Sequence, residues 1–461
     1  MDSIIKTPII PIKKTFAKVK GAHELNLEAI CIFAATGFFL DQDTYWKDEV
    51  VLRPATINTI DENGFLIESK PWFQWHYSPR KISFENALQE FTMLFETIIK
   101  EQTQNKKVIL PLSGGLDSRT QAVALRNHPQ LKSYSYAFYG GYPEHKIAKE
   151  IAEKCQFSFQ SFAVQKGYLW NCIEELAGIN KCYSEFTHPR QMAFIDKFKE
   201  LGDVFSLGHM GDLMFDSFKL PQLTFEEEVQ EIMKLFLKKG GLELATSLWN
   251  SWGLEGTFEN YFGSRISDLL KEFDIENTNS KLRAFKTQYA VASWSSNNLS
   301  VFENELPITL PYYDNRMCAF MCTIPEEYLT NRKLQIAYIQ QNAPDLAKIT
   351  WQEKKPFNLN NFHLNKMPYN LPYRITNKLK REFNGLLGKP FIQRNWELQF
   401  VGENNEKHLK KWLFDSKLKE VVPKKIIQQF FDDFKDKDAV NYSHPVSMLL
   451  TLALFQEKFN K

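Results

Sequence analysis

The stretch VILPLSGGLDS, residues 108–118, decides the fold of this chain. Its first four residues are typical of a buried strand, and the pair Gly114–Gly115 lets the backbone approach a ligand without interference from a Cβ atom. A helix from Arg119 to Arg126 would point its unpaired N–H groups back at this turn, which favours an anion there. The pattern predicts a strand, an anion-binding turn and a helix, in that order.

The polar residues of the turn favour a pyrophosphate group. Ser113 and Ser118 supply hydroxyl donors, and Asp117 supplies a carboxylate that can hold Mg²⁺ beside phosphates. The spacing differs from that of the Walker loop, which ends in Gly-Lys-Ser/Thr. It resembles the Ser-Gly-Gly-x-Asp-Ser loop of the PP-loop ATP pyrophosphatases, which cut ATP between its α and β phosphates. The resemblance implies that ATP and Mg²⁺ are the cofactors. The residues expected to bind ATP are Leu112, Ser113, Gly114, Gly115, Leu116, Asp117 and Ser118, together with Gly208 of a later glycine turn.

Strands and helices alternate on both sides of this turn. Residues 133–139 and 158–164 are typical of strands, and residues 144–155 carry apolar side chains at helical spacing. Such alternation builds an α/β fold with a parallel sheet and helices on both faces. Ligands then bind at the carboxyl ends of the strands, where the turn lies. We expect this core at about residues 105–220 and a helical remainder after it.

A second glycine turn occurs in VFSLGHMGDLMF, residues 204–215. A short strand ends there, Gly208 follows it, and Asp212 is presented next. Asp117 and Asp212 would then lie at neighbouring strand ends and could share Mg²⁺ on a triphosphate. Taken alone, this second turn is a weak signal, and a plain surface turn would be the favoured explanation.

The order of these motifs resembles the synthetase half of asparagine synthetases and of their relatives, the β-lactam synthetases and lasso-peptide cyclases. Three further segments follow the family pattern. Pro143–Ala152 resembles its Glu-x-x-x-Ala helix, Pro311–Asp314 its Pro-Phe-Leu-Asp, and Trp351–Phe357 its Trp-Arg-x-Lys-x-x-Phe. The resemblance implies a PP-loop synthetase domain over residues 81–461.

The resemblance places Lys354 at the position of the family's catalytic lysine, beside the metal-binding Asp117 and Asp212. A fixed ammonium there would stabilise the charge that develops on phosphorus and later on the oxyanion of amide formation. The implied reaction is that of a carbon–nitrogen ligase, which converts ATP to AMP and pyrophosphate while it adenylates a carboxylate. The alternative for Lys354 is a solvated basic surface position next to Lys355.

Residues 1–80 are predicted to form a small β-rich segment, a truncated remnant of a glutaminase-like domain. Gly37, Asp41 and Thr44 weakly resemble the end of that domain, but Asp2 stands where glutamine-dependent members have a nucleophilic cysteine. We therefore expect ammonia or an amine as the nitrogen donor, with a separate protein as one source. Leu213 replaces the family's usual glutamate after the second aspartate, which disfavours free aspartate as the acceptor.

Composition and charge exclude several classes of protein. Lys and Arg number 57 against 55 Asp and Glu, so the balance does not point to nucleic acid as a partner. The longest apolar run, residues 29–40, is too short to cross a bilayer, and no signal peptide is visible. The six cysteines show no zinc-ligand spacing. We expect a cytoplasmic protein without a membrane span.

Three functions remain open at this point. The first is an amide synthetase acting on a small-molecule, glycan or peptide carboxylate, in glycan or secondary-metabolite biosynthesis. The second is a PP-loop enzyme that modifies tRNA or makes nucleotides, for which Arg374, Lys378 and Arg381 would form a basic stripe on one helical face. The third is a non-catalytic family member that binds a nucleotide.

Overall fold

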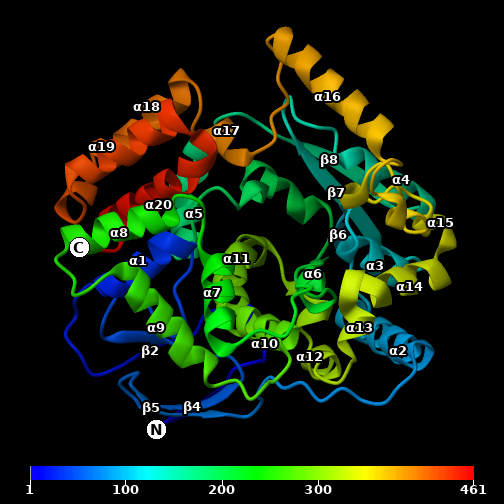
Figure 1. Ribbon diagram of the computed structural model, residues 1–461, viewed down its shortest axis with the longest axis horizontal. Coiled ribbons are helices and arrows are strands. Elements are labelled where there is room, and N and C mark those ends of the chain that lie inside the picture. The colour runs from blue at the N-terminus through cyan, green and yellow to red at the C-terminus, as the bar shows by residue number, and fades with distance from the viewer. Residues whose placement is uncertain (1, 461) are drawn as a thin grey trace.

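Five parallel strands form the sheet that carries the SGGLDS turn. The computed structural model describes residues 2–460, and its strand order in this sheet is β10-β9-β6-β7-β8. Figure 1 shows the sheet with helices around it. The α/β prediction is confirmed, with strands at β6 (Val108–Pro111), β7 (Leu131–Phe138), β8 (Ser158–Val164), β9 (Val204–Ser206) and β10 (Ile308–Thr309).

The register of β6 explains why two distant turns meet. Val108 pairs with Leu131 of β7 on one side and with Val204 of β9 on the other. Because all three strands are parallel, the residues that follow β6 and β9 emerge at the same edge of the sheet. The SGGLDS turn and the turn after residue 206 are therefore neighbours.

Amphipathic helices cover the sheet. In α4 (His145–Cys155) the buried residues recur at helical spacing, with Ile147, Ala148, Ile151 and Ala152 facing inward. The helix α3 (Asp117–Ala124) begins at Asp117, two residues earlier than the sequence pattern predicted. Asp117 therefore lies in the first helical turn, where the exposed N–H groups favour a negative charge. The other helices near the sheet are α2 (Phe84–Thr103), α12 (Asn315–Met321), α13 (Glu326–Leu329), α14 (Lys333–Asn342) and α15 (Pro344–Ala347).

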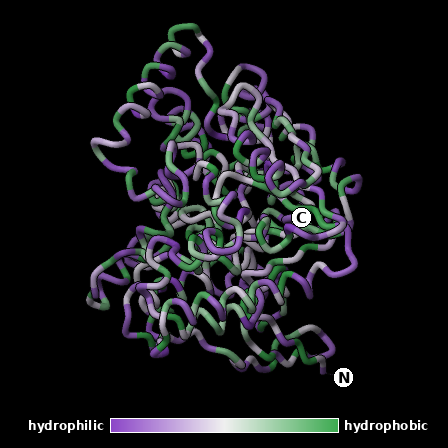
Figure 2. Tube along the Cα trace, turned by 90° about the vertical axis from the view of Figure 1, so that its right-hand side faces the viewer, coloured by the Kyte–Doolittle hydropathy of each residue, from purple (hydrophilic) through white to green (hydrophobic). Residues whose placement is uncertain are grey.

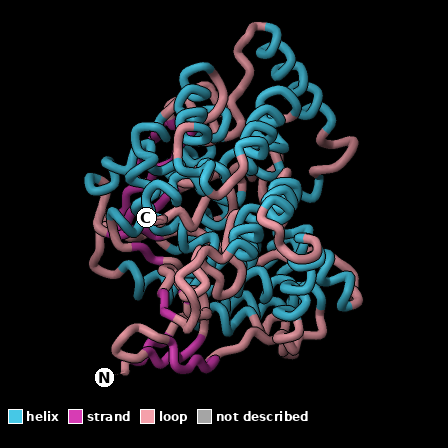
Figure 3. The backbone as a smooth tube through the Cα atoms, turned by 90° about the vertical axis from the view of Figure 1, so that its left-hand side faces the viewer, coloured by secondary structure: helices cyan, strands magenta, loops and turns pink. Residues whose placement is uncertain are grey.

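The N-terminal segment contains two small antiparallel sheets and one buried helix. The first sheet has β1 (Ser3–Lys6), β4 (Thr56–Ile60) and β5 (Leu66–Pro71), and the second has β2 (Phe16–Lys18) and β3 (Glu49–Val51). The strands lie near the N-terminal end in Figure 3. The helix α1 (Leu27–Thr36) is buried over eight of its ten residues, so this segment shares the apolar core of the whole chain. A domain boundary near residue 80 stays a prediction.

Apart from β9 and β10, the regular elements after residue 168 are helices. A capping box, in which Thr224 and Glu227 exchange hydrogen bonds with each other's backbone, starts α7. A π-helix, η2 (Lys286–Ser295), continues directly into α11 (Ser296–Glu305). The remaining helices between residues 168 and 285 are α5 (Tyr168–Asn180), η1 (Arg190–Glu200), α6 (Gly211–Met214), α7 (Phe225–Phe236), α8 (Gly241–Ser251), α9 (Phe258–Leu270) and α10 (Thr278–Phe285).

The last helices differ sharply in burial. The helix α20 (Ala439–Lys458) lies in the core with fourteen buried residues. Asp438 caps it by accepting hydrogen bonds from the backbone N–H groups of residues 440 and 441. By contrast, α16 (Leu371–Leu386) has no buried residue. Between them lie α17 (Asn395–Gln399), α18 (Glu403–Phe414) and α19 (Lys424–Asp432).

Two further predictions concern thiols and membranes. All six cysteines are free, and five of them are buried, as expected for apolar packing residues. Within residues 2–460, none of the helices combines the length and the apolar character that crossing a membrane requires.

Candidate functional site

The SGGLDS turn closes on itself through its two serines. The Ser118 hydroxyl lies 3.1 Å from the Ser113 hydroxyl and accepts a hydrogen bond of the same length from the Ser113 backbone N–H. The Gly115 N–H donates to the Ser113 hydroxyl at 3.2 Å. These bonds hold the turn in a narrow loop at the start of α3, where N–H groups without helical partners face the opening.

Glycines at the second turn let it lie directly against Asp117. A Cβ atom on Gly208 would come within 3.2 Å of the Asp117 Cβ, and a Cβ on Gly211 would clash with the Asp117 carboxylate. Any larger residue would push the two turns apart. Asp212 follows in the first turn of α6 and is exposed. The two carboxylates predicted from the sequence are thus brought together.

Asp117 is held by a network that the sequence did not reveal. Its carboxylate forms an ion pair with Arg332, of which only 8% is exposed, and accepts a hydrogen bond from Gln335 at 3.2 Å. Gln335 also accepts from Arg332 at 2.7 Å and donates to the Tyr312 hydroxyl at 3.0 Å. Arg332 has a left-handed backbone with φ of +61°, which is uncommon outside glycine and asparagine.

Burial and a second negative charge perturb Asp117. Burial raises the pKa of the Asp117 carboxyl to about 6; the charge of Arg332 opposes this rise, and the charge of Asp212 adds to it. A carboxyl group whose pKa lies near neutrality in a cavity is typical of a functional site. A cation placed between the two carboxylates would relieve their repulsion.

Asp117 and Asp212 line a cavity of about 430 Å³, which we call the carboxylate cavity. Lys286 also lines it; burial lowers the pKa of this lysine, while the charge of Asp212 acts in the opposite direction. His209 lies nearby, and burial lowers the pKa of its imidazole to about 4, so it is neutral at physiological pH. Apolar walls complete the cavity, with contributions from Phe38, Leu213, Leu235, Phe236, Val291 and Trp294.

A second cavity, of about 510 Å³, lies on the other side of the turn, and we call it the loop cavity. Ser113 and Gln352 line it together with Arg190. The Arg190 guanidinium lies 3.4 Å from the Tyr136 hydroxyl and above the Phe138 ring, while its buried Nε has no hydrogen-bond partner in the structure. A buried donor without a partner is costly, so this guanidinium is available to a polar ligand.

The segment that carries Lys354 contacts the loop through Gln352, and the Lys354 ammonium points elsewhere. The neighbouring Gln352 donates its N–H to the Gly114 carbonyl at 3.0 Å and accepts from the Gly114 N–H at 3.1 Å. The Lys354 ammonium instead lies 2.6 Å from Glu353 and 5.4 Å from the centre of the Trp351 ring. The structure therefore places the lysine segment against the loop, with the charged end turned aside.

Arg119 fixes that segment to the loop. Its guanidinium is fully buried and donates to the carbonyls of Ile349 at 3.0 Å and Thr350 at 2.8 Å. The same group donates to the Gly114 carbonyl at 3.3 Å. Because the rigid guanidinium of Arg119 bonds to both segments, it fixes the distance between the loop and the start of the lysine segment.

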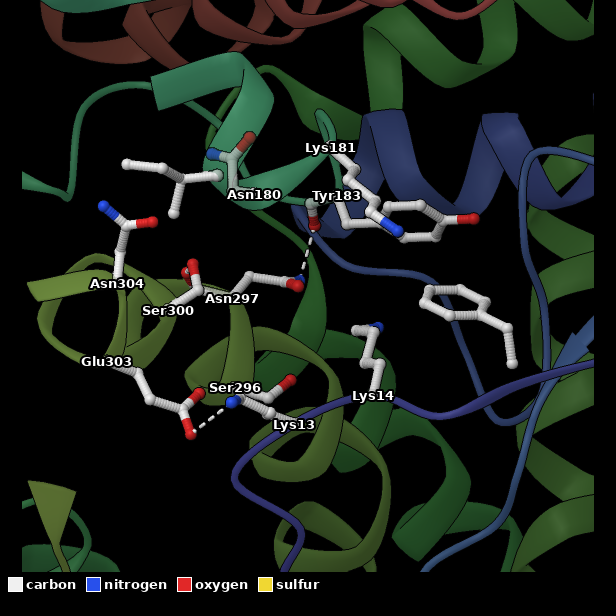
Figure 4. Close-up of a pocket in the computed structure, with 12 residues that line it drawn as sticks. Lys13, Lys14, Asn180, Lys181, Tyr183, Ser296, Asn297, Ser300, Glu303 and Asn304 are labelled. Carbon is white, nitrogen blue, oxygen red and sulfur yellow. Dashed lines mark hydrogen bonds and ion pairs between the residues drawn. The ribbon is translucent and has the colours of Figure 1, made fainter. Parts of the chain in front are cut away.

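A third cavity, of about 480 Å³, lies away from the loop (Figure 4). Lys13, Lys14 and Lys181 line it, and Lys13 pairs with Glu303 at 2.9 Å. Burial lowers the pKa of Lys14 to about 7. No residue of either glycine turn lines this cavity, so we separate it from the candidate site.

Sequence reasoning missed the basic members of the site. Arg332 and Lys286 follow none of the motifs, and Arg190 stands at the start of η1 with no recognisable pattern around it. Only the folded chain brings these three cations to the edge of the sheet. Tyr312, which accepts a hydrogen bond from Gln335, is an uncharged member of the same network and belongs to the Pro-Tyr-Tyr-Asp motif.

Comparisons with known proteins bear on this arrangement. The family described as asparagine synthase matches residues 90–457, well over half of the chain. A comparison with curated proteins gives no match. Among solved structures, the glutamine-dependent NAD⁺ synthetase from Acinetobacter baumannii in complex with ADP is 14% identical, with a TM-score of 0.19. That match covers 40% of this chain and 39% of the other, so the strand order described above remains the basis of the fold assignment.

Proposed function

The chain belongs to the asparagine synthase family, and we propose that it is an ATP-dependent amide synthetase that forms AMP and pyrophosphate. Family membership supports an ATP-using synthetase that makes carbon–nitrogen bonds. The finer assignment, to adenylation of an acceptor carboxylate followed by attack of ammonia or an amine, is our proposal.

One observation carries the proposal: the SGGLDS loop borders two cavities at once. Ser113 lines the loop cavity, and Asp117, four residues later, lines the carboxylate cavity. A nucleotide lying across the loop would place its phosphates between two compartments of a size typical for small-molecule sites. Transfer of a nucleotidyl group needs this arrangement, because donor and acceptor must meet at the α-phosphorus.

We assign the nucleoside to the loop cavity. The N–H groups at the start of α3 and the hydroxyls of Ser113 and Ser118 would hold the departing pyrophosphate. Arg190, whose buried Nε has no partner among the described residues, supplies a cationic group on the nucleoside side. Gln352 now accepts from the Gly114 N–H, so a bound phosphate would compete with its side chain for that donor.

We assign the acceptor carboxylate to the carboxylate cavity. Lys286 would attract the acid, and the apolar walls would take an uncharged body. Leu213 lines this cavity at the position where the family usually has glutamate. The absence of a carboxylate at that position disfavours a zwitterion such as aspartate. A small-molecule, glycan or peptide carboxylate with an apolar portion suits the walls better.

The donor set fits Mg²⁺. This ion is usually bound by one or two carboxylates together with substrate phosphates, and Asp117 and Asp212 supply that pair. Within residues 2–460 no third histidine, cysteine or carboxylate joins them, which agrees with a site that phosphates complete. When bound, the ion would neutralise charge on the phosphates of ATP.

The reaction then uses groups of this chain in two steps. In the first, a carboxylate oxygen of the acceptor attacks the α-phosphorus. The bond from that phosphorus to the pyrophosphate oxygen breaks, and the N–H and hydroxyl donors of the loop hold the pyrophosphate as it leaves. In the second, the nitrogen donor attacks the acyl carbon and AMP leaves. We propose that Lys354 turns from Glu353 toward the loop and stabilises the extra negative charge in both steps.

The test is mass spectrometry of the full chain incubated with ATP, Mg²⁺, ammonium and a panel of carboxylic acids of increasing apolar size. We expect AMP, pyrophosphate and an amide from at least one acid. The Lys286→Met variant should raise the KM for that acid more than it lowers kcat. ATP binding without AMP across the panel would contradict the proposal.

ATP binding without AMP formation would instead indicate a non-catalytic nucleotide-binding protein. The orientation of Lys354 toward Glu353 and the neutralisation of Asp117 by Arg332 are both features that a non-catalytic nucleotide-binding protein would have. The two functions differ in one measurement, because only the synthetase releases pyrophosphate in an acceptor-dependent way.

A further inference from the structure

The helix α16 projects from the body of the protein with an uncovered apolar face. Figure 1 shows it at the periphery, and no residue of the helix is buried. Leu379 is 59% exposed, Phe383 62% and Leu386 88%. Monomeric proteins rarely leave a row of large apolar side chains in water without a binding role.

The apolar residues of α16 form one stripe. At 100° per residue, Leu371, Ile375, Leu379, Phe383 and Leu386 fall within an arc of about 120°. The residues that are half-buried against the protein, Tyr373, Asn377 and Asn384, lie on the opposite side of the helix. The stripe therefore faces solvent and not the body of the chain. The helix at the top of Figure 2 carries both hydrophobic and hydrophilic residues along its length.

Basic residues border the stripe on both sides. Arg374, Lys378 and Arg381 lie along one border and Lys380 along the other. Between Lys366 and Lys389 the only acidic residue is Glu382. At the same 100° per residue Glu382 falls within the apolar arc, and its carboxylate lies 3.8 Å from Lys378. The basic stripe noted in the sequence is thus one half of an amphipathic surface.

We propose that α16 is an interfacial helix that docks the protein on an anionic lipid surface. A helix with Leu, Ile and Phe on one face, Lys and Arg at the borders and low overall hydrophobicity lies in the plane of a membrane interface. Its basic side chains would then meet lipid headgroups of opposite charge. The helix lies on the membrane and does not cross it.

Charge and shape select this occupant over two others. A second copy would bring an equally basic helix against the first, and the like charges would repel. A nucleic acid would satisfy the arginines and lysines but would leave the Leu, Ile and Phe side chains in water. A lipid interface takes both halves of the surface at once, and a lone helix can enter it without a matching pocket.

The segment that follows α16 lines the loop cavity, so membrane binding by α16 would affect the position of that cavity. Shortly after the helix, Phe391 stacks on Tyr142 with ring centres 4.3 Å apart, and Ile392 and Gln393 line the loop cavity. Tyr142 lines the same cavity. A helix held on a membrane would therefore keep the opening of this cavity near the lipid surface.

The test uses the full chain and vesicles of phosphatidylcholine with increasing fractions of phosphatidylserine, in a flotation assay. We expect binding to rise with phosphatidylserine and to fall with added salt. Leu379→Ser with Phe383→Ser should lower the partition coefficient about tenfold or more, because it removes the centre of the stripe. Arg374→Glu with Arg381→Glu should abolish the dependence on phosphatidylserine.

A matched control variant distinguishes binding by the stripe from nonspecific hydrophobic binding to vesicles. Ile67 is 58% exposed on β5, and Ile67→Ser should leave vesicle binding unchanged. All variants change exposed side chains, and their thermal unfolding should match the starting protein. Equal vesicle binding by the stripe variant and the starting protein overturns the proposal. A concentration-dependent dimer that the stripe variant dissociates, or tRNA binding without vesicle binding, also overturns it and assigns the surface to that partner.

Discussion

Asp117, which is half-buried, and Glu185, which is buried, are two carboxylates with opposite surroundings. Glu185 is 3% exposed and accepts hydrogen bonds from the Thr187 N–H at 2.6 Å, from the Thr187 hydroxyl at 2.5 Å and from the Ser447 hydroxyl at 2.7 Å. It also forms an ion pair with His188 at 2.9 Å. Burial alone would raise the pKa of this carboxyl, but His188 and the hydroxyl donors outweigh burial and hold the pKa well below its usual range.

Asp117 shows the reverse balance. Burial raises the pKa of the Asp117 carboxyl to about 6, and the charge of Asp212 adds to the rise, while Arg332 and Gln335 offset only part of it. Glu185 is therefore satisfied by the protein itself, whereas Asp117 keeps unused capacity for a ligand. The number of hydrogen-bond donors around a carboxylate, more than its burial, therefore distinguishes a carboxylate that stabilises the fold from one that can bind a ligand.

The largest expected effect is on catalysis at Asp117. Asp117→Asn removes the charge that we assign to metal binding, so acceptor-dependent pyrophosphate release should fall by about 10³-fold or more. The surface variant Asp268→Asn, whose side chain is 67% exposed, should retain full activity. Undiminished pyrophosphate release in Asp117→Asn would falsify the assignment and erase the difference between the two carboxylates.

Glu185 should behave in the opposite way. Glu185→Ala leaves buried donors and His188 without their partner, so the free energy of unfolding in urea should drop by about 3–5 kcal/mol. Activity per folded molecule should remain unchanged. Glu174→Ala, at a site 70% exposed and paired with Lys458, is the control and should cost under about 1 kcal/mol. A similarly small loss at Glu185 would mean that its donors contribute little.

The two groups should also give opposite dependences of stability on pH. Between its ordinary pKa of 3.8 and the folded value of about 6, Asp117 keeps a proton in the folded chain that the unfolded chain releases. Rising pH therefore lowers the unfolding free energy through this group, by about 1.4 kcal/mol per pH unit at most. Urea titrations from pH 4 to pH 7 should show this component in the starting protein and not in Asp117→Asn.

For Glu185 the sign is reversed. Its folded pKa lies below the ordinary value of 4.5, so its contribution is complete above that pH and is lost as the pH falls further. Below pH 4.5 the starting protein should lose stability more steeply than Glu185→Gln. Parallel curves for the two proteins would show that His188 and the hydroxyl donors do not favour the charged carboxylate.

The smallest effect concerns Arg332. Its charge lowers the pKa of Asp117, so Arg332→Met should raise that pKa further. The rising limb of kcat/KM for pyrophosphate release should then move to higher pH by about one unit. Arg332→Lys keeps the charge and should shift the limb less. A limb that does not move in Arg332→Met would separate the rate from the ionisation of Asp117.

Local patterns predicted the parts of the structure that local physics determines. The strand, turn and helix around Gly114–Gly115 are continuous in sequence, and the neighbouring positions of Asp117 and Asp212 follow from a parallel sheet. The partners of Asp117 could not be found in that way, because Arg332 lies 215 residues from it in the chain. The orientation of Lys354 depends on a choice of rotamer beside Glu353, which no spacing records. The prediction that Lys354 is catalytic remains untested.

The sequence alone also did not reveal that the apolar face of α16 is exposed. The sequence showed Arg374, Lys378 and Arg381 at helical spacing, and the apolar residues between them would suit any helix packed on a core. Only the structure shows that the body contacts the opposite side of the helix. An unpartnered face is a property of the whole arrangement, and a single segment does not contain it.

The burial of α20 against α1 has a consequence for biosynthesis. The His444 imidazole lies 2.9 Å from the Ala34 carbonyl across 410 residues of sequence. The apolar side chains of α1 emerge from the ribosome long before their partner helix is translated. Contacts between residues so far apart in the sequence form slowly, and apolar helices that are exposed before their partners are made tend to aggregate. We expect the nascent chain to depend on a chaperone until residues near 450 have been made.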